Sequence, residues 1–172
     1  MTKIIFIAGS PGTGKSTISK ILRKKLKNSA LVGLSWLRGY HLDNTWSNAT
    51  DKEEQMSFEN LTFIINNYIK NNYSYVIVSD LLDKRVVEIP NIFNQSNFLI
   101  FSLYVNNDME LKNRVLDDTR DSGYRNYKEA LVWNRNIIKR EAVVNEFKID
   151  NSERDPQKAI KIILQKIEES HL

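Results

Sequence analysis

Residues 9–16 read Gly-Ser-Pro-Gly-Thr-Gly-Lys-Ser and match the pattern G-x-x-x-x-G-K-[ST] at every fixed position. The loop directly follows the apolar run Ile4–Ala8, and a segment with helical periodicity begins at Thr17. The pattern requires this context, in which a strand passes through the loop into a helix. The sequence therefore predicts a P-loop, a phosphate-binding turn at the end of a first buried strand.

Each residue type in this loop has a role in binding a triphosphate. Glycines adopt backbone conformations closed to other residues and let main-chain N–H groups approach phosphate oxygens. The start of the following helix adds unpaired N–H groups and partial positive charge. Lys15 is expected to reach the outer phosphates, and the Ser16 hydroxyl to hold Mg²⁺, which prefers oxygen ligands. The predicted nucleotide-binding residues are Gly9, Gly12, Thr13, Gly14, Lys15, Ser16 and Thr17.

Composition narrows the class of protein. The length of 172 residues suits one domain spanning residues 1–172. The chain has no cysteine, which excludes disulfides, thiolate zinc sites and a cysteine nucleophile. The first apolar run is too short for a signal peptide, and no other run reaches membrane-spanning length, so we expect a cytoplasmic protein without a membrane partner. The net charge of +4 suits an anionic substrate or simply solubility.

Strands and helices are predicted to alternate along the whole chain. Thr50–Glu53 has the form of a capping box, and Asp155 followed by Pro156 is typical of a helix start. The alternation favours a doubly wound parallel sheet with right-handed crossovers. Strands are predicted at residues 4–8, 30–34, 75–79, 98–105 and 146–150, and helices at 17–27, 50–71, 84–94, 108–117, 127–145 and after 155.

Beyond the loop, the order of elements resembles the small P-loop kinases, a group that includes nucleoside monophosphate kinases, shikimate and gluconate kinases, chloramphenicol phosphotransferase and 5′-hydroxyl polynucleotide kinases. The N-K-x-D segment of GTPases does not occur in the sequence. The resemblance implies an α/β fold, namely a three-layer α/β/α sandwich with a five-stranded parallel sheet of order 2-3-1-4-5. It also implies ATP as donor and a mobile, arginine-bearing lid at about residues 118–126. Asp150-Asn151-Ser152 resembles the loop that borders adenine in these kinases.

Acidic and basic residues beyond the loop match this group more weakly. Asp80 ends the third predicted strand, and carboxylates at such ends face the crevice where open α/β sheets bind ligands. Asp80 is therefore the first candidate for a place near Mg²⁺ or the acceptor, and Asp83 the second. Arg120 and Arg125 fall in the expected lid, where arginines stabilise the charge of a transferring phosphoryl group, and Arg114 is a further candidate.

The acceptor site is expected between the second strand and the long helix, at residues 35–49. Several hydroxyl kinases of this group carry an aspartate just after the second strand, where this chain has Ser35, and the next acid is Asp43. Arg38 resembles the arginine of nucleoside monophosphate kinases, and a guanidinium grips phosphate at two points. Trp36 offers an aromatic ring for stacking. These residues predict a nucleotide or another small anionic metabolite as acceptor.

Other functions agree with the same sequence. A polynucleotide 5′-hydroxyl kinase is compatible with the basic first helix. Such a kinase would bind its acceptor with an affinity that falls steeply as the salt concentration rises. A kinase acting on an antibiotic or small alcohol would need a base such as Asp43 or Asp80. A non-catalytic ATP-binding module would bind ATP tightly without turning over any acceptor.

Overall fold

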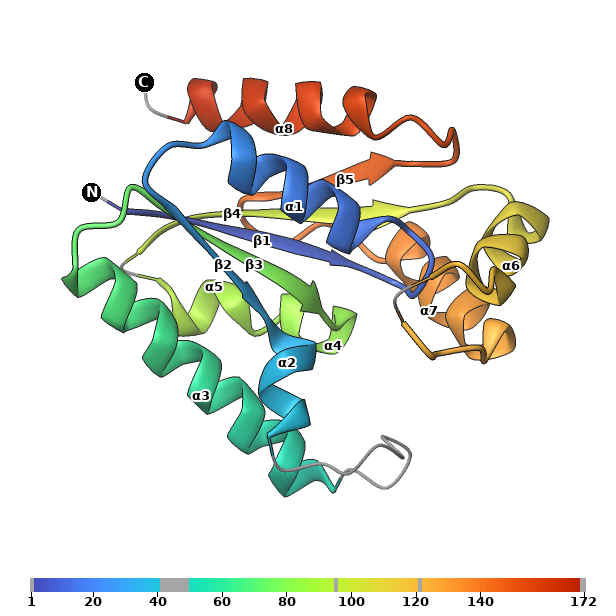
Figure 1. Ribbon diagram of the computed structural model, residues 1–172, viewed down its shortest axis with the longest axis horizontal. Helices are drawn as coiled ribbons and strands as arrows, with labels where there is room; N and C mark the ends of the chain where they lie inside the picture. Colours follow the sequence, from blue (N-terminus) through green and yellow to red (C-terminus); the bar gives the residue numbers. More distant parts are fainter. Residues whose placement is uncertain (1, 41–49, 95, 121, 171–172) are drawn as a thin grey trace.

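The computed structural model describes residues 2–40, 50–94, 96–120 and 122–170. Five strands form one parallel sheet in the order β2-β3-β1-β4-β5, which confirms the predicted fold class and strand order (Figure 1). The first strand is central because strands β3 and β4 pair with its two edges. The strands are β1 (Lys3–Gly9), β2 (Ser29–Gly33), β3 (Tyr75–Leu81), β4 (Asn97–Tyr104) and β5 (Glu146–Asp150).

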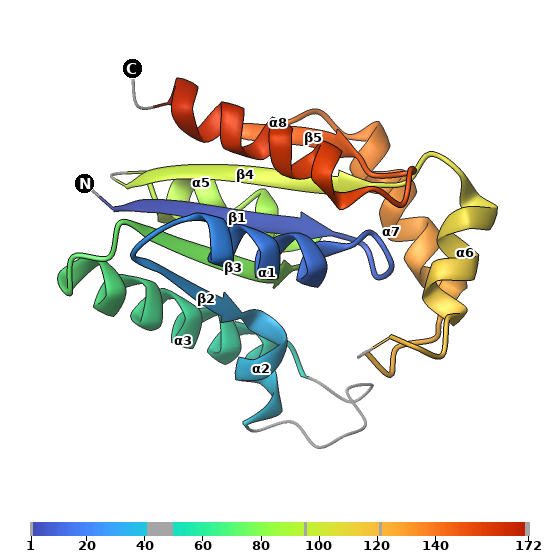
Figure 2. The ribbon, with the colours of Figure 1, turned by 45° about the horizontal axis from the view of Figure 1, so that its top comes forward.

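Helices cover both faces of this sheet (Figures 1 and 2). One face carries α1 (Lys15–Lys25) and α8 (Pro156–Glu169), and the other carries α3 (Asp51–Lys70), α4 (Asp83–Val86) and α5 (Ile89–Ile92). The remaining helices are α2 (Leu34–Gly39), α6 (Asp108–Leu116) and α7 (Tyr127–Lys139). Among the helices so described, none has the length and apolar character needed to cross a membrane.

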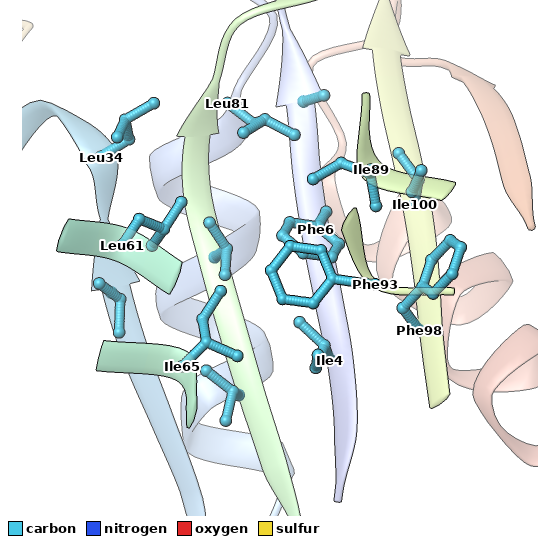
Figure 3. Close-up of a cluster of buried hydrophobic side chains, with 14 of the residues drawn as sticks. Ile4, Phe6, Leu34, Leu61, Ile65, Leu81, Ile89, Phe93, Phe98 and Ile100 are labelled. Carbon is cyan, nitrogen blue, oxygen red and sulfur yellow. The ribbon is translucent and has the colours of Figure 1, made fainter. Parts of the chain in front are cut away.

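Strand β1 owes its central place to an unbroken run of apolar side chains. All seven of its residues are buried, and successive side chains enter opposite cores. Ile4 and Phe6 join the core under α3, α4 and α5, where Phe6 packs against Phe93 at a ring-centroid distance of 5.3 Å (Figure 3). Ile5 and Ile7 pack under α1 and α8. The strand that leads into the glycine loop is therefore held firmly on both sides.

The helix starts predicted from capping residues are confirmed. The Thr50 hydroxyl accepts a hydrogen bond from the Glu53 N–H at 3.3 Å, while the Glu53 carboxylate accepts one from the Thr50 N–H at 2.8 Å. Asp155 accepts a hydrogen bond from the Gln157 N–H at 2.9 Å, with Pro156 at the start of α8. Both caps satisfy N–H groups that have no partner within their helices.

Two predicted helices differ from the structure. The segment 84–94 splits into α4 and α5, because Pro90 has no N–H to continue one helix and instead lies in the first turn of the next. The helix predicted over 127–145 ends at Lys139. Arg140 is the extended residue that ends it, and its side chain binds acids of other elements.

Candidate active site

The glycine loop joins β1 to α1 in a conformation that suits phosphate binding. Gly9 and Gly14 have φ angles of +145° and +95°, and a Cβ atom on Gly9 would lie 2.6 Å from the Leu103 carbonyl oxygen. Thr13 Oγ1 donates a hydrogen bond to the Ser10 carbonyl at 2.8 Å, which closes the turn. The loop therefore presents bare backbone at the start of a helix, as a triphosphate ligand requires.

Lys15 lies within this loop and is half-buried. Its ammonium donates to the Ser10 carbonyl oxygen at 2.9 Å. Burial lowers the pKa of Lys15, the nearby Asp80 carboxylate acts to raise it, and the nearby Arg120 guanidinium lowers it further. Asp80 precedes Leu81, which pairs with Ala8 near the end of β1, and the charges of Asp80 and of Arg120 in the segment after α6 both act on Lys15. The cluster has two cations and one anion, so an anionic ligand would relieve its excess positive charge.

Asp80 leaves the regular pattern of strand β3. Phe6 pairs with Val78 and Ala8 with Leu81, so β3 has one extra residue at this point. Asp80 also has a φ angle of +63°, which is uncommon for a residue other than glycine. Its Oδ2 accepts a hydrogen bond from Ser35 Oγ at 2.8 Å. Bulges re-aim side chains next to active sites, and the Asp80 side chain here binds Ser35 in the first turn of α2.

Asp83, the second candidate acid, belongs to a different cluster. Its Oδ1 lies 2.7 Å from Nη2 of Arg140, which also pairs with the fully buried Glu146 carboxylate. Burial acts to raise the pKa of Glu146, but hydrogen bonds from Arg140 and Ser102 hold it below its usual range. Asp83 therefore belongs to an ion-pair network that links α4 to the loop after α7 and to β5.

The two arginines predicted in the lid brace its backbone. Arg120 donates to the carbonyl oxygens of Val115 and Tyr124 at 2.8 and 3.2 Å. Arg125 donates to the Ser122 and Tyr124 carbonyl oxygens at 2.5 and 3.0 Å. Burial lowers the pKa of Arg120, and the neighbouring charge of Arg125 lowers it further. Both arginines donate to the Tyr124 carbonyl oxygen, so the structure brings the two side chains together.

Arg114 takes a role that the sequence did not indicate. Its guanidinium donates to the carbonyl oxygens of Asn151 and Ser152 at 2.8 and 2.6 Å and to Glu110 at 2.7 Å. Arg114 therefore fastens α6 to the loop between β5 and α8. No local pattern indicated these contacts, because Asn151 lies 37 positions and Ser152 38 positions after Arg114 in the chain.

The predicted acceptor residues have mixed surroundings. Arg38 forms an ion pair with Glu54 at the start of α3, and both side chains are only 14% exposed. Trp36 is 62% exposed, and its indole lies beside Gly33. Asp43 lies outside the described residues. Ser35, named in the sequence only as the replacement for an expected acid, is the residue of this segment that contacts Asp80.

A protease experiment tests whether the segment 118–126 acts as a lid. Tryptic cleavage after Arg125 is expected to slow about tenfold when an ATP analogue and an acceptor are both bound, because an ordered segment is a poorer protease substrate. Cleavage after Lys70, an exposed residue at the end of α3, serves as the control and should not change. Equal cleavage rates after Arg125 in the free and bound protein would contradict a closing lid.

The fold and the loop together define a P-loop protein built like the small kinases. A family model described as an AAA domain matches residues 5–134, so the chain belongs to that family. A sequence comparison with curated proteins finds no match.

Solved structures support the same class. An unliganded sugar kinase from Janibacter sp. HTCC2649 is 13% identical with a TM-score of 0.69, covering 98% of this chain and 95% of its own. Thymidylate kinase from Candida albicans is 15% identical with a TM-score of 0.66, covering 99% and 94%. A gluconokinase from Sinorhizobium meliloti is 11% identical with a TM-score of 0.70, covering 97% and 92%. At these identities the likeness establishes the fold, which confirms the predicted resemblance to small P-loop kinases.

Proposed function

We propose that this protein transfers the terminal phosphoryl group of ATP to a small acceptor in a Mg²⁺-dependent reaction. The observation that carries the proposal is the glycine loop itself: Gly9 and Gly14 have positive φ angles, Lys15 binds the Ser10 carbonyl oxygen, and the pairing of β3 with β1 places Asp80 near the end of β1. Phosphoryl transfer needs positioning and charge stabilisation more than covalent help from the protein. These two needs are met by a loop of bare backbone amides together with a lysine, a carboxylate and an arginine.

The chemistry of each side chain suggests its role in the transfer. MgATP, when bound, supplies the phosphoryl group and the metal that neutralises part of its charge. Lys15 and the loop amides would hold the outer phosphates, and the exposed Ser16 hydroxyl would hold Mg²⁺, with Asp80 behind it through water. Arg120 and Arg125 would stabilise negative charge on the transferring group and exclude water when the segment closes.

For the acceptor, we propose a nucleotide or another small anionic metabolite bound by Arg38. The Glu54 carboxylate orients the guanidinium, yet Arg38 Nε is buried and, within the described part of the chain, has no hydrogen-bond partner. A guanidinium has five N–H donors, so one carboxylate leaves several for a ligand. The exposed Trp36 on the same short helix offers a ring for stacking.

Substitution of Arg38 tests this assignment. Arg38→Ala is expected to raise the acceptor KM about tenfold or more, since hydrogen bonds to charged groups contribute about 1.5–3 kcal/mol. The KM for ATP should stay within about twofold, because the loop amides and Lys15 hold the donor. Steady-state kinetics on the best acceptor from a panel of nucleotides, nucleosides, sugars, antibiotics and oligonucleotides supplies both constants. Unchanged acceptor kinetics, or an uncharged alcohol as the best substrate, would contradict the role of Arg38.

A hydroxyl acceptor is the second candidate, favoured by the Ser35–Asp80 hydrogen bond. Asp80 Oδ2 already accepts a hydrogen bond from an alcohol, at 2.8 Å. A substrate hydroxyl in a similar position would be oriented by the same carboxylate, which would then take its proton. The panel separates the candidates, and a steep loss of oligonucleotide phosphorylation with added salt would indicate a polynucleotide acceptor.

A further inference from the structure

The loop between β5 and α8 contacts the glycine loop through one side chain. Asn151, only 8% exposed, donates a hydrogen bond from Nδ2 to the Thr13 carbonyl oxygen at 2.8 Å. The two residues are 138 positions apart, so this bond spans nearly the whole chain. It joins the loop after the last strand to the loop after the first.

This bond controls the orientation of one peptide group. The Thr13 carbonyl and the Gly14 N–H belong to the same planar trans peptide, so they point in opposite directions. Holding the carbonyl toward Asn151 therefore directs the Gly14 N–H away from the β5–α8 loop. Gly14 has a φ angle of +95° and lacks a Cβ, which would lie 2.8 Å from Asn151 Nδ2. Glycine thus makes room for the amide but leaves the backbone free to rotate unless a contact fixes it.

The backbone of Asn151 is itself held by two hydrogen bonds. Its N–H donates to the Tyr104 carbonyl at 2.8 Å, and Arg114 donates to its carbonyl oxygen at 2.8 Å. The side-chain amide therefore comes from a rigid support, which a residue that orients a neighbouring peptide needs.

We propose that Asn151 is a positioning residue for the triphosphate: by binding the Thr13 carbonyl, it keeps the Gly14 N–H turned toward a bound phosphate. Without this bond the peptide is free to flip, and a flipped peptide presents its carbonyl oxygen to an anion. This role differs from a contact with the nucleotide base, because it acts on the phosphates through the backbone. The proposal rests on the triphosphate binding part of the proposed function and is independent of the acceptor.

The test is calorimetric binding of MgADP and of magnesium tripolyphosphate, which has no base, to the wild-type protein and to Asn151→Ala and Asn151→Leu. Both variants are expected to weaken both ligands about tenfold or more, since each loses the hydrogen bond that orients a charge-binding group. Asn151→Leu has nearly the same shape as the native residue, carries no charge and leaves no cavity, so it keeps the test valid if the alanine variant folds poorly. Thermal unfolding without ligand identifies such a folding loss.

Asn106→Ala is the matched control. It removes the bond to Asp150 on the far side of the same loop and leaves the Thr13 bond in place, so ligand affinities should change less than about threefold. The proposal is overturned if the Asn151 variants weaken MgADP but not tripolyphosphate, if they weaken neither, or if tripolyphosphate fails to bind the wild-type protein. The binding experiment contains no acceptor, so it is independent of catalysis. A wild-type protein that binds both ligands yet phosphorylates no acceptor would refute the proposed function and leave the role of Asn151 unaffected.

Discussion

Replacing Lys15 by alanine is expected to lower phosphoryl transfer by about a hundredfold to a thousandfold, the loss typical when one preorganised charge-stabilising group is removed. The Lys15 ammonium lies in the glycine loop with the Ser10 carbonyl oxygen as a hydrogen-bond partner, and the charges of Asp80 and Arg120 both act on it. Affinity for MgATP should fall with the rate, because the same charge binds the outer phosphates. Titration calorimetry and steady-state turnover on the same preparation measure both effects.

The fold should survive this substitution. Burial already lowers the pKa of Lys15, which means that its charge is partly desolvated without a full partner. Its removal is therefore expected to leave the free energy of unfolding unchanged or slightly raised. Lys24→Ala, at an exposed position of the same helix, is the control and should match the wild-type protein in binding and turnover. Unchanged ATP affinity together with unchanged turnover in Lys15→Ala would contradict the site.

The second large effect separates two aspartates that are three residues apart. Asp80→Asn is expected to lower kcat about a hundredfold and to raise the Mg²⁺ concentration needed for half-maximal rate, because it removes the carboxylate near the end of β1 whose charge acts on Lys15. Asparagine is among the residues that tolerate the positive φ angle found at Asp80, so the backbone should keep its bulge. Kinetics over a Mg²⁺ titration give both quantities.

Asp83→Asn should show the opposite pattern. It weakens the ion pair with Arg140 and is expected to lower the free energy of unfolding by about 1–3 kcal/mol while kcat stays near the wild-type value. Denaturant unfolding measures the stability loss. If Asp83→Asn reduces the rate more than Asp80→Asn does, the assignment of Asp80 to the reacting centre is wrong.

The elements that follow from local pattern were predictable from the sequence. The continuous apolar run of β1 predicted a central strand, and the glycine loop after it predicted the strand-loop-helix unit that the structure contains. The capping residues at Thr50 and Asp155 marked helix starts correctly because their hydrogen bonds are local. The prediction of one helix over 84–94 was wrong, because Pro90 has no N–H with which to continue a helix.

The parts that depend on distant contacts were not predictable in the same way. The bulge that redirects Asp80 arises from the pairing of β3 with β1, which no window of sequence contains. Arg140 ends α7 early, and its side chain binds Asp83 and Glu146 on other elements. The sequence placed Asn151 in a loop resembling one that borders adenine, whereas in the structure its side chain contacts the glycine loop. Sequence thus located the triphosphate loop and the candidate residues, but the partners of each side chain required the fold.

Transfer of the γ-phosphoryl group itself is the most direct test of the proposed function. The wild-type protein and Lys15→Ala would each be incubated with Mg²⁺, γ-labelled ATP and the acceptor panel, and ADP and labelled products would be quantified together. We predict that the wild-type protein transfers label to one class of small acceptor with an equal amount of ADP formed, and that Lys15→Ala does neither at a comparable rate. Tight binding of MgATP by the wild-type protein without label on any acceptor, and without ADP above the level of the variant, would contradict a phosphotransferase and indicate a non-catalytic ATP-binding module.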